Sequence, residues 1–533
     1  MAFLKIDKKQ TGNYIRLIES YREKGKVRNR VIASLGKVED YTPKMLRRMG
    51  EKLYTLGGGN ITDLIGGNVS EIGRYNYGFV QAVNKGLTYY GLDTILTRLT
   101  RKHKLSFSLS DVVKLLLAER LNEPVSKLCS YDNQQEYLGL KKVELQHIYR
   151  SLNYLAKNTK LIQKQIFQTG RDLFNMQLDV VFYDVTTFYF SSEIEGSLRQ
   201  KGFGKDGKIG KTQVVFGLLI DKDKNPVAYR LYKGSQYEGH TFEDAIKTLK
   251  QEYQIDKVIV VADRGMLSKH NIDIVSGTFE FIVGERLKSL PKNIQSKLLD
   301  IENYKQQWIY TKDDNQIKLK YQSIQYQGRT IISTYSEKRA RKDAADREQR
   351  IEKAKKLLQT PSLINKKPSR YYLKNETSGK FILNQKKIDT DKQYDGFIAI
   401  STNNTSLKPE DVLDHYRHLF QIEQTFRSFK SHLEIRPMFH WNDIRIEGHI
   451  ALCYIAYAIE NHLIQKLKKA KVEISENKLR KALGQMQVSL VKQKGNEFYL
   501  RSNNQDLTAN IINKLGLSKI PNLIPKDKLI SYL

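Results

Sequence analysis

The stretch that decides the fold is Val180–Phe190, VVFYDVTTFYF, which carries one carboxylate among β-branched and aromatic residues. This composition predicts a strand that is buried on both faces. A buried carboxylate without a partner is unstable, so Asp184 needs a basic side chain, backbone donors or a metal ion. The stretch by itself is equally compatible with a structural and a functional role for Asp184.

The bulk composition indicates the kind of partner. The 533 residues are enough for two to four domains, and 90 Lys and Arg against 58 Asp and Glu give a net charge of +32. This surplus favours nucleic acid as the partner, and a merely lysine-rich basic protein is the alternative. Cys129 and Cys453 form neither a zinc spacing nor a disulfide framework. With no signal peptide and no long apolar run, we expect a cytoplasmic, nucleoid-associated protein.

Outward from Asp184, the chain reads as a mixed α/β domain. Strands are predicted at 178–190, 213–220 and 226–232, followed by a helix at 241–252 and a strand at 257–263. Three strands followed by αβ units is the order of a ribonuclease H-like fold, a mixed sheet flanked by helices. We therefore expect this catalytic domain at 177–286 and 394–467, interrupted by a β-rich insertion at 287–393.

The flanking regions have different compositions. Residues 1–60 predict a hairpin with a turn at Gly25, and the first 50 residues carry 13 Lys and Arg against 5 Asp and Glu. This makes 1–60 an α+β region and a candidate DNA-binding region. Residues 61–176 read as helices, and 468–533 as a mainly α C-terminal region.

Two further acids lie at favourable places. Asp263 ends its strand, where ligand sites gather in open α/β sheets, although a capping role is equally compatible. Glu423 lies in the predicted helix 415–433. Seven-residue spacing puts Tyr416, Glu423 and Lys430 on one stripe, which is either a site wall or a solvated edge. The apolar residues beside this stripe form the predicted core face: Leu419, Ile422, Phe426, Phe429 and Leu433.

Three carboxylates are what phosphodiester chemistry needs. Two Mg²⁺ or Mn²⁺ ions activate the attacking oxygen and stabilise the leaving oxygen, and such hard cations prefer carboxylate ligands. We expect Asp184, Asp263 and Glu423 to converge on two such ions. The ions would also explain why a buried strand carries Asp184.

Three blocks in order resemble the DDE transposases of bacterial insertion sequences, specifically the insertion-sequence-four type. They are YDVTTFYF from Tyr183, VVADRGM from Val260 and YRHLFQIEQTFRSFK from Tyr416. The last block resembles the Y-R-E-K signature of that family, with Tyr416, Glu423 and Lys430 at the signature spacing. Leu419 stands at the arginine position, so Arg417 or Arg427 would have to supply that charge.

The resemblance implies a complete site and mechanism. Asp184, Asp263 and Glu423 would bind the metals, and Tyr416 and Lys430 would hold DNA phosphates. The long gap between Asp263 and Glu423 would hold the β-rich insertion known in the family. The implied activity is cut-and-paste transposition through a DNA hairpin, carried out by a homodimer on double-stranded DNA, namely the inverted-repeat ends and the target.

Alternatives remain at this level. Trp308, in the insertion, stacks on an extruded base or, more commonly for such a residue, packs on a strand face. The whole chain is a transposase, a non-catalytic DNA-binding transposase derivative, or a ribonuclease H-like nuclease or resolvase without strand transfer. The intact acids and the Tyr-Glu-Lys stripe favour the transposase.

Overall fold

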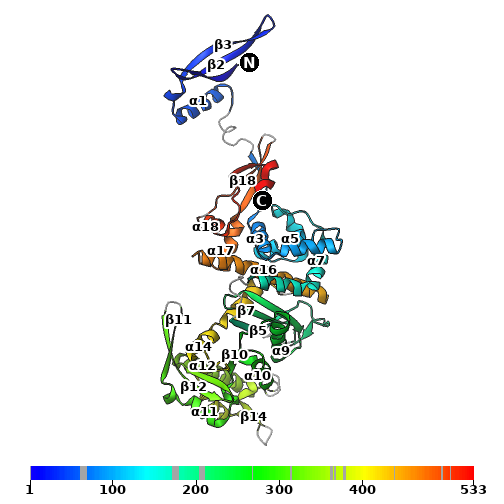
Figure 1. The fold of residues 1–533 in the computed structure, drawn as a ribbon, viewed down its shortest axis with the longest axis vertical. Helices are drawn as coiled ribbons and strands as arrows, with labels where there is room; N and C mark the ends of the chain where they lie inside the picture. Colours follow the sequence, from blue (N-terminus) through cyan, green and yellow to red (C-terminus); the bar gives the residue numbers. More distant parts are fainter. Residues whose placement is uncertain are drawn as a thin grey trace. The chain divides into compact units, whose positions relative to one another are not determined.

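The computed structural model describes residues 2–59, 69–170, 179–202, 210–266, 268–312, 315–360, 364, 368–375, 380–436, 438–493, 496–504 and 506–532. Contacts divide the chain into two compact units (Figure 1). We call 1–74, 489–500 and 522–529 the N-terminal unit, and 75–488, 501–521 and 530–533 the main unit. The expected boundaries at 60–61 and 176–177 lie in or beside stretches outside the described residues. No described helix combines the length and the apolar character needed to cross a membrane.

The N-terminal unit begins with a three-stranded antiparallel sheet of β1 (Ala2–Lys9), β2 (Gly12–Glu23) and β3 (Lys26–Lys37). Lys24 and Gly25 both have positive φ, +47° and +78°. This is the two-residue turn whose twist matches that of the flanking strands. The predicted hairpin is therefore confirmed, with β1 added at its edge. Helix α1 (Pro43–Leu56) follows, and Thr42 caps it by accepting a hydrogen bond from Met45 N.

The C-terminal region is less helical than expected. Besides α17 (Glu476–Gln485) and α18 (Asp506–Leu515), it contributes β17 (Gln487–Gln493), β18 (Asn496–Arg501) and β19 (Leu523–Pro525). These strands form a four-stranded sheet with β4 (Val69–Asn76), in the order β19-β18-β17-β4. A strand that pairs with a segment about 400 residues away leaves little local signal, because its stability comes from the distant partner.

The first part of the main unit is helical, as expected. The helices are α3 (Gly78–Tyr89), α4 (Leu92–Lys102), α5 (Leu109–Asn122), α6 (Lys127–Asp132), α7 (Leu145–Lys157) and α8 (Thr159–Gly170). Of these, α3, α5, α7 and α8 pack on α16 (Asp443–Lys469), which runs across the unit in Figure 1 and buries most of its residues between Ile446 and Leu463. A helix that is apolar all round is a core helix. The predicted apolar helix at 446–467 is therefore confirmed.

The central element is a ten-stranded mixed sheet. The order of the strands is β11-β12-β13-β16-β10-β9-β5-β7-β6, with β8 also paired to β7. The edge strand β6 is the short segment Gln200–Lys201. The bounds of its central strands are β5 (Val180–Tyr189), β7 (Thr212–Asp221), β8 (Pro226–Lys233), β9 (Ile259–Ala262), β10 (Glu280–Glu285) and β16 (Phe397–Thr402). Strands β5, β9 and β10 are parallel and β7 and β8 are antiparallel, so the predicted mixed α/β sheet is present.

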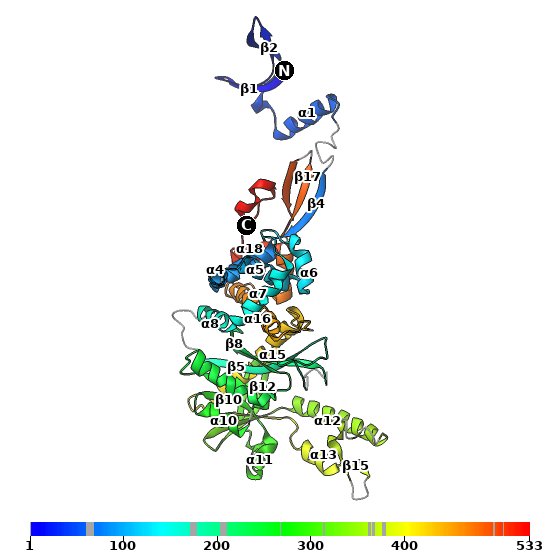
Figure 2. The same ribbon diagram turned by 90° about the vertical axis from the view of Figure 1, so that its right-hand side faces the viewer.

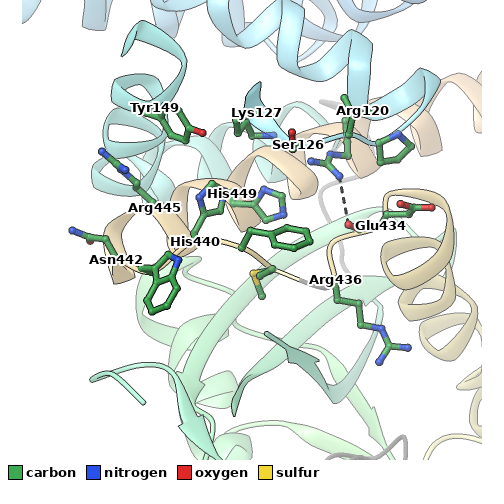
Figure 3. A pocket seen from close by; sticks show the side chains of 15 residues that line it. Arg120, Ser126, Lys127, Tyr149, Glu434, Arg436, His440, Asn442, Arg445 and His449 are labelled. Carbon is green, nitrogen blue, oxygen red and sulfur yellow. Dashed lines mark hydrogen bonds between the residues drawn. The ribbon is translucent and has the colours of Figure 1, made fainter. Parts of the chain in front are cut away.

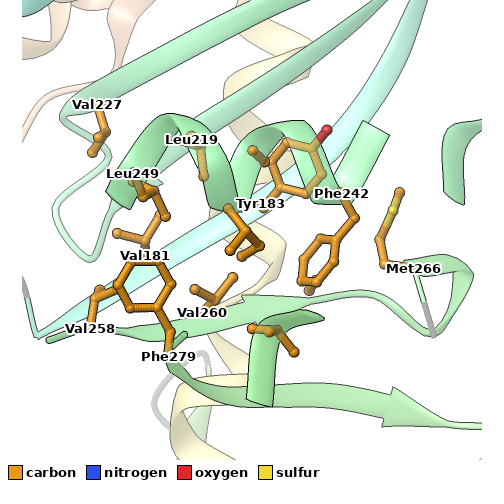
Figure 4. Close-up of a cluster of buried hydrophobic side chains, with 14 of the residues drawn as sticks. Val181, Tyr183, Leu219, Val227, Phe242, Leu249, Val258, Val260, Met266 and Phe279 are labelled. Carbon is orange, nitrogen blue, oxygen red and sulfur yellow. The ribbon is translucent and has the colours of Figure 1, made fainter. Parts of the chain in front are cut away.

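Helices cover both faces of the sheet. On one face, α9 (Thr241–Lys247) and α10 (Lys269–Ser276) close a core in which Tyr183 contacts Phe242 (Figure 4). The hydroxyl of Tyr183 is 2.7 Å from Thr241 Oγ1, which satisfies the buried polar atom. On the other face, Phe216 of β7 contacts Phe426 and Phe429. The residues of β5 thus alternate between two buried faces, which explains its apolar composition.

The three long strands of the segment 287–393 belong to the central sheet, and among its described residues only the short pair β14 (Leu373–Asn375) and β15 (Phe381–Leu383) forms a sheet of its own. Strands β11 (Gln306–Lys312), β12 (Asn315–Tyr326) and β13 (Arg329–Tyr335) continue the central sheet, because β13 pairs with β16 from Tyr335↔Phe397 to Thr330↔Thr402. Its helical part contains α12 (Glu337–Leu358) and α13 (Gln385–Lys392), which lie together in Figure 2. The sequence shows the change of pattern at 287, but not that the new strands extend the old sheet.

Candidate active site

Strands β5 and β9 place two of the three acids side by side. They are parallel, with Tyr183 opposite Ala262, so Asp184 and Asp263 are the next residues along the two neighbouring strands. Neighbouring strands are about 4.8 Å apart. Tyr183 and Ala262 both belong to the core shown in Figure 4. Because side chains alternate along a strand, Asp184 lies on the opposite face of the sheet.

The surroundings of Asp184 answer why a buried strand tolerates a carboxylate. Its side chain is half-buried, and Oδ1 accepts a 2.7 Å hydrogen bond from the backbone N–H of Val185. A backbone donor stabilises the charged form of a carboxylate. The sequence interpretation offered three kinds of partner, and the structure supplies at least this one.

Glu423 comes from the helix that covers the face bearing Asp184. It lies on α15 (Phe420–Arg427), and Phe426 of the same helix contacts Phe216 of β7. Phe216 is directly opposite Thr186 in the sheet, two residues from Asp184 and therefore on the same face. The two strands and α15 thus bring all three acids to one side of the sheet.

Two of the acids line a common cleft of about 850 Å³ within the main unit. Asp263, Glu423 and Tyr416 are among its lining residues, and Asp184 is not. Residues of α12 and of the end of β10 around Gly284 also line this cleft. Most of the residues that line the cleft are charged, which suits a charged macromolecular substrate better than a small apolar ligand.

Tyr416 is positioned by Asp263. It lies in the last turn of α14 (Pro409–Arg417), and its hydroxyl is 3.5 Å from Asp263 Oδ1. Burial raises the pKa of Tyr416, and the charge on Asp263 raises it further. The hydroxyl therefore keeps its proton at neutral pH and donates toward the carboxylate. Gly284 makes this approach possible, because a Cβ there would lie 2.5 Å from Tyr416 Oη.

The donor set fits a hard cation, but the described residues contain no preassembled cluster. No three His, Cys, Asp or Glu side chains among them are grouped closely enough to hold a metal ion. Asp184, Asp263 and Glu423 nevertheless offer carboxylate oxygens from one side of the sheet, and such oxygens are what Mg²⁺ and Mn²⁺ prefer. The three carboxylates therefore fit such an ion by their chemistry and by their position on one side of the sheet. Their side chains would have to move closer together to bind it.

The expectation of one straight helix over 415–433 is wrong. Helix α14 ends at Arg417, α15 starts at Phe420, and Ser428–His432 form a π-helical turn, η10. The 2.9 Å hydrogen bond from Leu433 N to Ser428 O spans five residues, which marks this wider turn. Two interruptions break the constant 100° step on which the seven-residue stripe depends. Tyr416 and Glu423 line the cleft, whereas Lys430 is half-buried outside its lining.

The predicted core face survives these interruptions. Four of its five residues are buried, and Leu419, at the position of the signature arginine, is half-buried. The buried four are Ile422, Phe426, Phe429 and Leu433. Packing against β7 and α16 fixes this face, so it depends less on regular helix geometry than the stripe does.

Arg417 and Trp308 connect α14 to strand β11. Arg417 Nη1 donates to Thr311 O at 3.1 Å, and its guanidinium lies 4.6 Å from the ring centre of Tyr310. Trp308 is 6% exposed, and its indole N–H donates to Asp414 Oδ1 at 3.3 Å. In this conformation the indole has no open face for a base. Arg427 is exposed on α15.

The sequence interpretation missed a basic wall on α12. Arg339, Lys342, Arg347 and Arg350 all line the cleft that contains Asp263 and Glu423. Their spacings of three, five and three residues keep them on one side of the helix. Arg347 is held by Asp395, with Nη1 2.5 Å from Oδ2. The spacing of these four basic residues in the sequence was the signal that could have identified the cleft-facing side of α12.

Other cations of the cleft are available to a ligand. Arg264, Lys342 and Arg350 form no ion pair with any carboxylate that the structure describes. Arg286 Nε donates to the backbone oxygen of Arg264 at 3.3 Å, which ties the loop after Asp263 to the end of β10. The cleft thus combines acids that suit cations with free cations that suit phosphate.

The comparisons with known proteins agree with this arrangement. A family model described as "Transposase DDE domain" matches residues 176–459, more than half of the chain. The chain therefore belongs to the DDE transposases. A second model, described as "IS1634 family transposase, N-terminal domain", matches residues 4–57. The transposase is thus that of an insertion sequence, as expected, and the N-terminal match is to the IS1634 family.

Other comparisons add little. No curated protein sequence matches the chain. One solved structure, "Mos1 transposase paired-end complex with left transposon end", is 16% identical with a TM-score of 0.15. The match covers 40% of this chain and 62% of that chain, so this chain spans less than two thirds of that protein's length. That TM-score is too low to establish a shared fold.

Proposed function

We propose that this transposase catalyses cut-and-paste transposition at the site formed by Asp184, Asp263 and Glu423. The observation that carries the proposal is the β5–β9 register, which sets Asp184 beside Asp263 on the face covered by α15. The DNA ends would be cut, joined through a hairpin, reopened and transferred to target DNA. Each step is an attack of an oxygen nucleophile on a phosphate, so one site suffices.

Each group in the cleft has a distinct task in this proposal. Asp184, Asp263 and Glu423 would hold two Mg²⁺ or Mn²⁺ ions, which when bound supply activation of the attacking oxygen and stabilisation of the leaving oxygen. The single proton of the Tyr416 hydroxyl would be donated either to the Asp263 carboxylate or to a DNA phosphate. Arg264, Lys342 and Arg350 bind the DNA backbone on the two sides of the scissile bond.

The partners are part of the same proposal. A net charge of +32 and the match of residues 4–57 to a transposase N-terminal domain support binding to double-stranded DNA at the inverted-repeat ends and at the target. Two copies would pair the two ends as a homodimer, acting at the nucleoid in the cytoplasm.

The test uses the full chain with DNA carrying the element end, Mg²⁺ or Mn²⁺, and denaturing gels. We expect a nick, then a hairpin, then products joined to target DNA. Cutting without joining, even from a pre-cut end, would favour the nuclease or resolvase alternative. Tight binding without any cutting under either metal would favour the non-catalytic derivative.

Gly284→Ala tests whether Tyr416 must approach Asp263. The added Cβ would lie 2.5 Å from Tyr416 Oη and 2.9 Å from Arg264 Cβ, so both side chains must move. We expect DNA cleavage to fall on the order of 100-fold, as is typical for a misplacement of about 1 Å. The matched control is Gly277→Ala, where the nearest atom is Asp273 O at 3.5 Å. Equal cleavage by both variants would show that the approach of Tyr416 is dispensable.

The tip of the N-terminal hairpin tests end recognition. Arg22 and Lys26 are exposed and form no ion pair with a described carboxylate. If both contact phosphates, Arg22→Ala with Lys26→Ala should reduce the slope of log K against log salt by about 1.8, since each contact contributes about 0.9. Gel-shift titration at several salt concentrations measures this slope.

The matched control for the hairpin removes two exposed lysines near the start of β9, the end away from Asp263: Lys250→Ala with Lys257→Ala. It removes the same charge, and we expect its slope with end DNA to stay near that of the wild type. If the two double variants behave alike, the hairpin has no special part in end binding.

A further inference from the structure

A second pocket of about 400 Å³ lies away from the acidic cleft, within the main unit (Figure 3). One wall is the end of α5 and the start of α6, which contribute Arg120 and Lys127. The other wall is the segment 434–442 with the beginning of α16, which contributes Arg445 and His449. None of these residues belongs to the proposed catalytic site.

The pocket contains two buried cations, and the buried carboxylate of Glu119 acts on Lys127 electrostatically without forming an ion pair with it. Arg120 is 4% exposed and Lys127 is 5% exposed, and neither forms an ion pair with a described carboxylate. Arg120 Nη1 donates to Leu433 O at 2.9 Å, while its Nε has no hydrogen-bond partner in the described chain. Glu434 is the one carboxylate in the lining, and Arg120 contacts only its backbone oxygen. A buried charge without an ion-pair partner is costly, and a bound anion would offset that cost.

Burial first, and repulsion between neighbouring cations second, shift the pKa values of the pocket residues. Burial, and then the charge of Arg120, lowers the pKa of Lys127 to about 7. Burial, followed by Lys127 and Arg445, lowers the pKa of His440 to about 4. The rings of His440 and His449 are 5.2 Å apart, and as neutral imidazoles each offers an N–H donor. A bound anion would relieve the repulsion that these shifts report.

Aromatic side chains form the rim of the pocket. Phe439 is 66% exposed and Trp441 is 60% exposed, although large aromatic side chains are usually covered. The guanidinium of Arg199 lies 5.2 Å from the Trp441 ring centre and holds one side of it. Exposed aromatic rings beside a cationic groove are the combination that binds a nucleic-acid strand, with bases on the rings and phosphates on the cations.

The pocket is attached to the strand that carries Asp184. Met438 N donates to Tyr189 O at 3.2 Å, and Ser191 N donates to Met438 O at 3.3 Å. The segment bearing Phe439 and Trp441 is therefore fixed to the end of β5. Six residues of strand from Asp184 to Phe190 span about 20 Å, which matches about six nucleotides at 3.4 Å each.

We propose that this pocket binds one backbone phosphate of the DNA, about six nucleotides from the scissile phosphate, with an adjoining base against Trp441. The inference rests on the proposed function, because the scissile phosphate is placed at Asp184 and Asp263. Arg120 and Lys127 bind the phosphate oxygens, and the two histidines donate further hydrogen bonds. The pocket fixes the position of the DNA relative to the cleft.

The test scans neutral methylphosphonate linkages along the end DNA and measures binding of the full chain without metal. Wild type should lose about tenfold in affinity at one linkage near the sixth nucleotide from the scissile bond. Lys127→Met should bind unmodified DNA about tenfold more weakly and be insensitive to that one linkage, while staying sensitive at others. Trp441→Ala should also weaken binding about tenfold. The control, Lys114→Met, lies on α5 outside the pocket lining and should behave as wild type.

The stability of Lys127→Met separates a binding role from a structural one. Removing an unpaired buried charge should leave the melting temperature of the free protein unchanged or raise it. A lower melting temperature together with an unchanged methylphosphonate profile would overturn the proposal. A second result would also overturn the proposal: no methylphosphonate linkage affects binding, while inorganic phosphate raises the melting temperature of wild type but not of Lys127→Met. The pocket would then bind a free anion and not the DNA backbone.

The same scan is independent of the catalytic proposal. A wild type that shows the sensitive linkage but never cuts would leave the pocket assignment standing and remove the proposed function. If wild type cuts and joins DNA, and Lys127→Met responds as wild type does at every linkage, the proposed function stands and the pocket assignment is removed.

Discussion

Replacing Asp263 by asparagine should abolish Mg²⁺-dependent DNA cleavage, with a loss of several orders of magnitude. The change keeps the shape of the side chain but removes the charge that a hard cation requires. Asp184→Asn and Glu423→Gln should have the same effect, because the three carboxylates act as one set. Binding to end DNA should persist in all three variants, since the phosphate contacts come from lysine and arginine.

A matched control lies just before the other end of β9. Asp256 precedes β9 at its other end, is 92% exposed and pairs with Lys250 at 3.0 Å. Asp256→Asn should cut DNA as wild type does in the same gel assay. Near-normal cutting by any variant of the triad would remove that residue from the proposed metal site.

Arg329→Met should lower the free energy of unfolding by about 3–5 kcal/mol, the typical cost of leaving a buried charge unpaired. Arg329 Nη1 is 2.9 Å from Glu285 Oε2, and the two side chains are 12% and 2% exposed. The pair joins the start of β13 to the end of β10, inside the central sheet. Urea unfolding followed by circular dichroism measures the change.

The stability lost in Arg329→Met should depend on pH, and it should be larger at higher pH. Burial raises the pKa of Glu285, and the charge of Arg329 opposes that shift. A carboxyl whose pKa is raised on folding contributes stability that falls as pH rises through the window between its unfolded and folded pKa. Without Arg329 the folded pKa rises further, so the deficit should be larger at about pH 7 than at about pH 5.

A double variant, Glu285→Leu with Arg329→Met, removes both charges and should recover most of the lost stability. A single Arg329→Met variant as stable as wild type at neutral pH would show that Glu285 is already protonated there. The ion pair would then contribute nothing to the sheet.

The elements around Asp184 could be predicted because their signals are local. The order of β5, β7, β8, α9 and β9 follows from apolar runs and turn residues. The pairing of Asp184 with Asp263 could not be predicted, because strand register is set by the packing of Tyr183 and Ala262 in the core. The sequence could suggest that the acids converge. Only the strand register shows that Asp184 and Asp263 lie next to each other.

The misjudged features depend on non-local contacts. The break after Arg417 and the π-turn at Ser428–His432 occur in a sequence with ordinary helical periodicity. Here Phe429 packs on both Phe216 and Tyr457, and tertiary packing overrides regular helix geometry. In the same way, the basic residues of α12 can be assigned to the cleft only once the structure places this helix in the same cleft lining as Asp263.

The continuity of the central sheet has a consequence for how such a protein can be rebuilt or can evolve. Because β13 is hydrogen-bonded along β16, which in turn pairs with β10, residues 287–393 cannot be exchanged as an independent cassette between relatives. A graft that ends at Arg286 and Gly396 would carry one half of a strand pair and leave the other half behind. Chimeras that conserve the β13–β16 seam as a unit should fold, and those that cut through it should not.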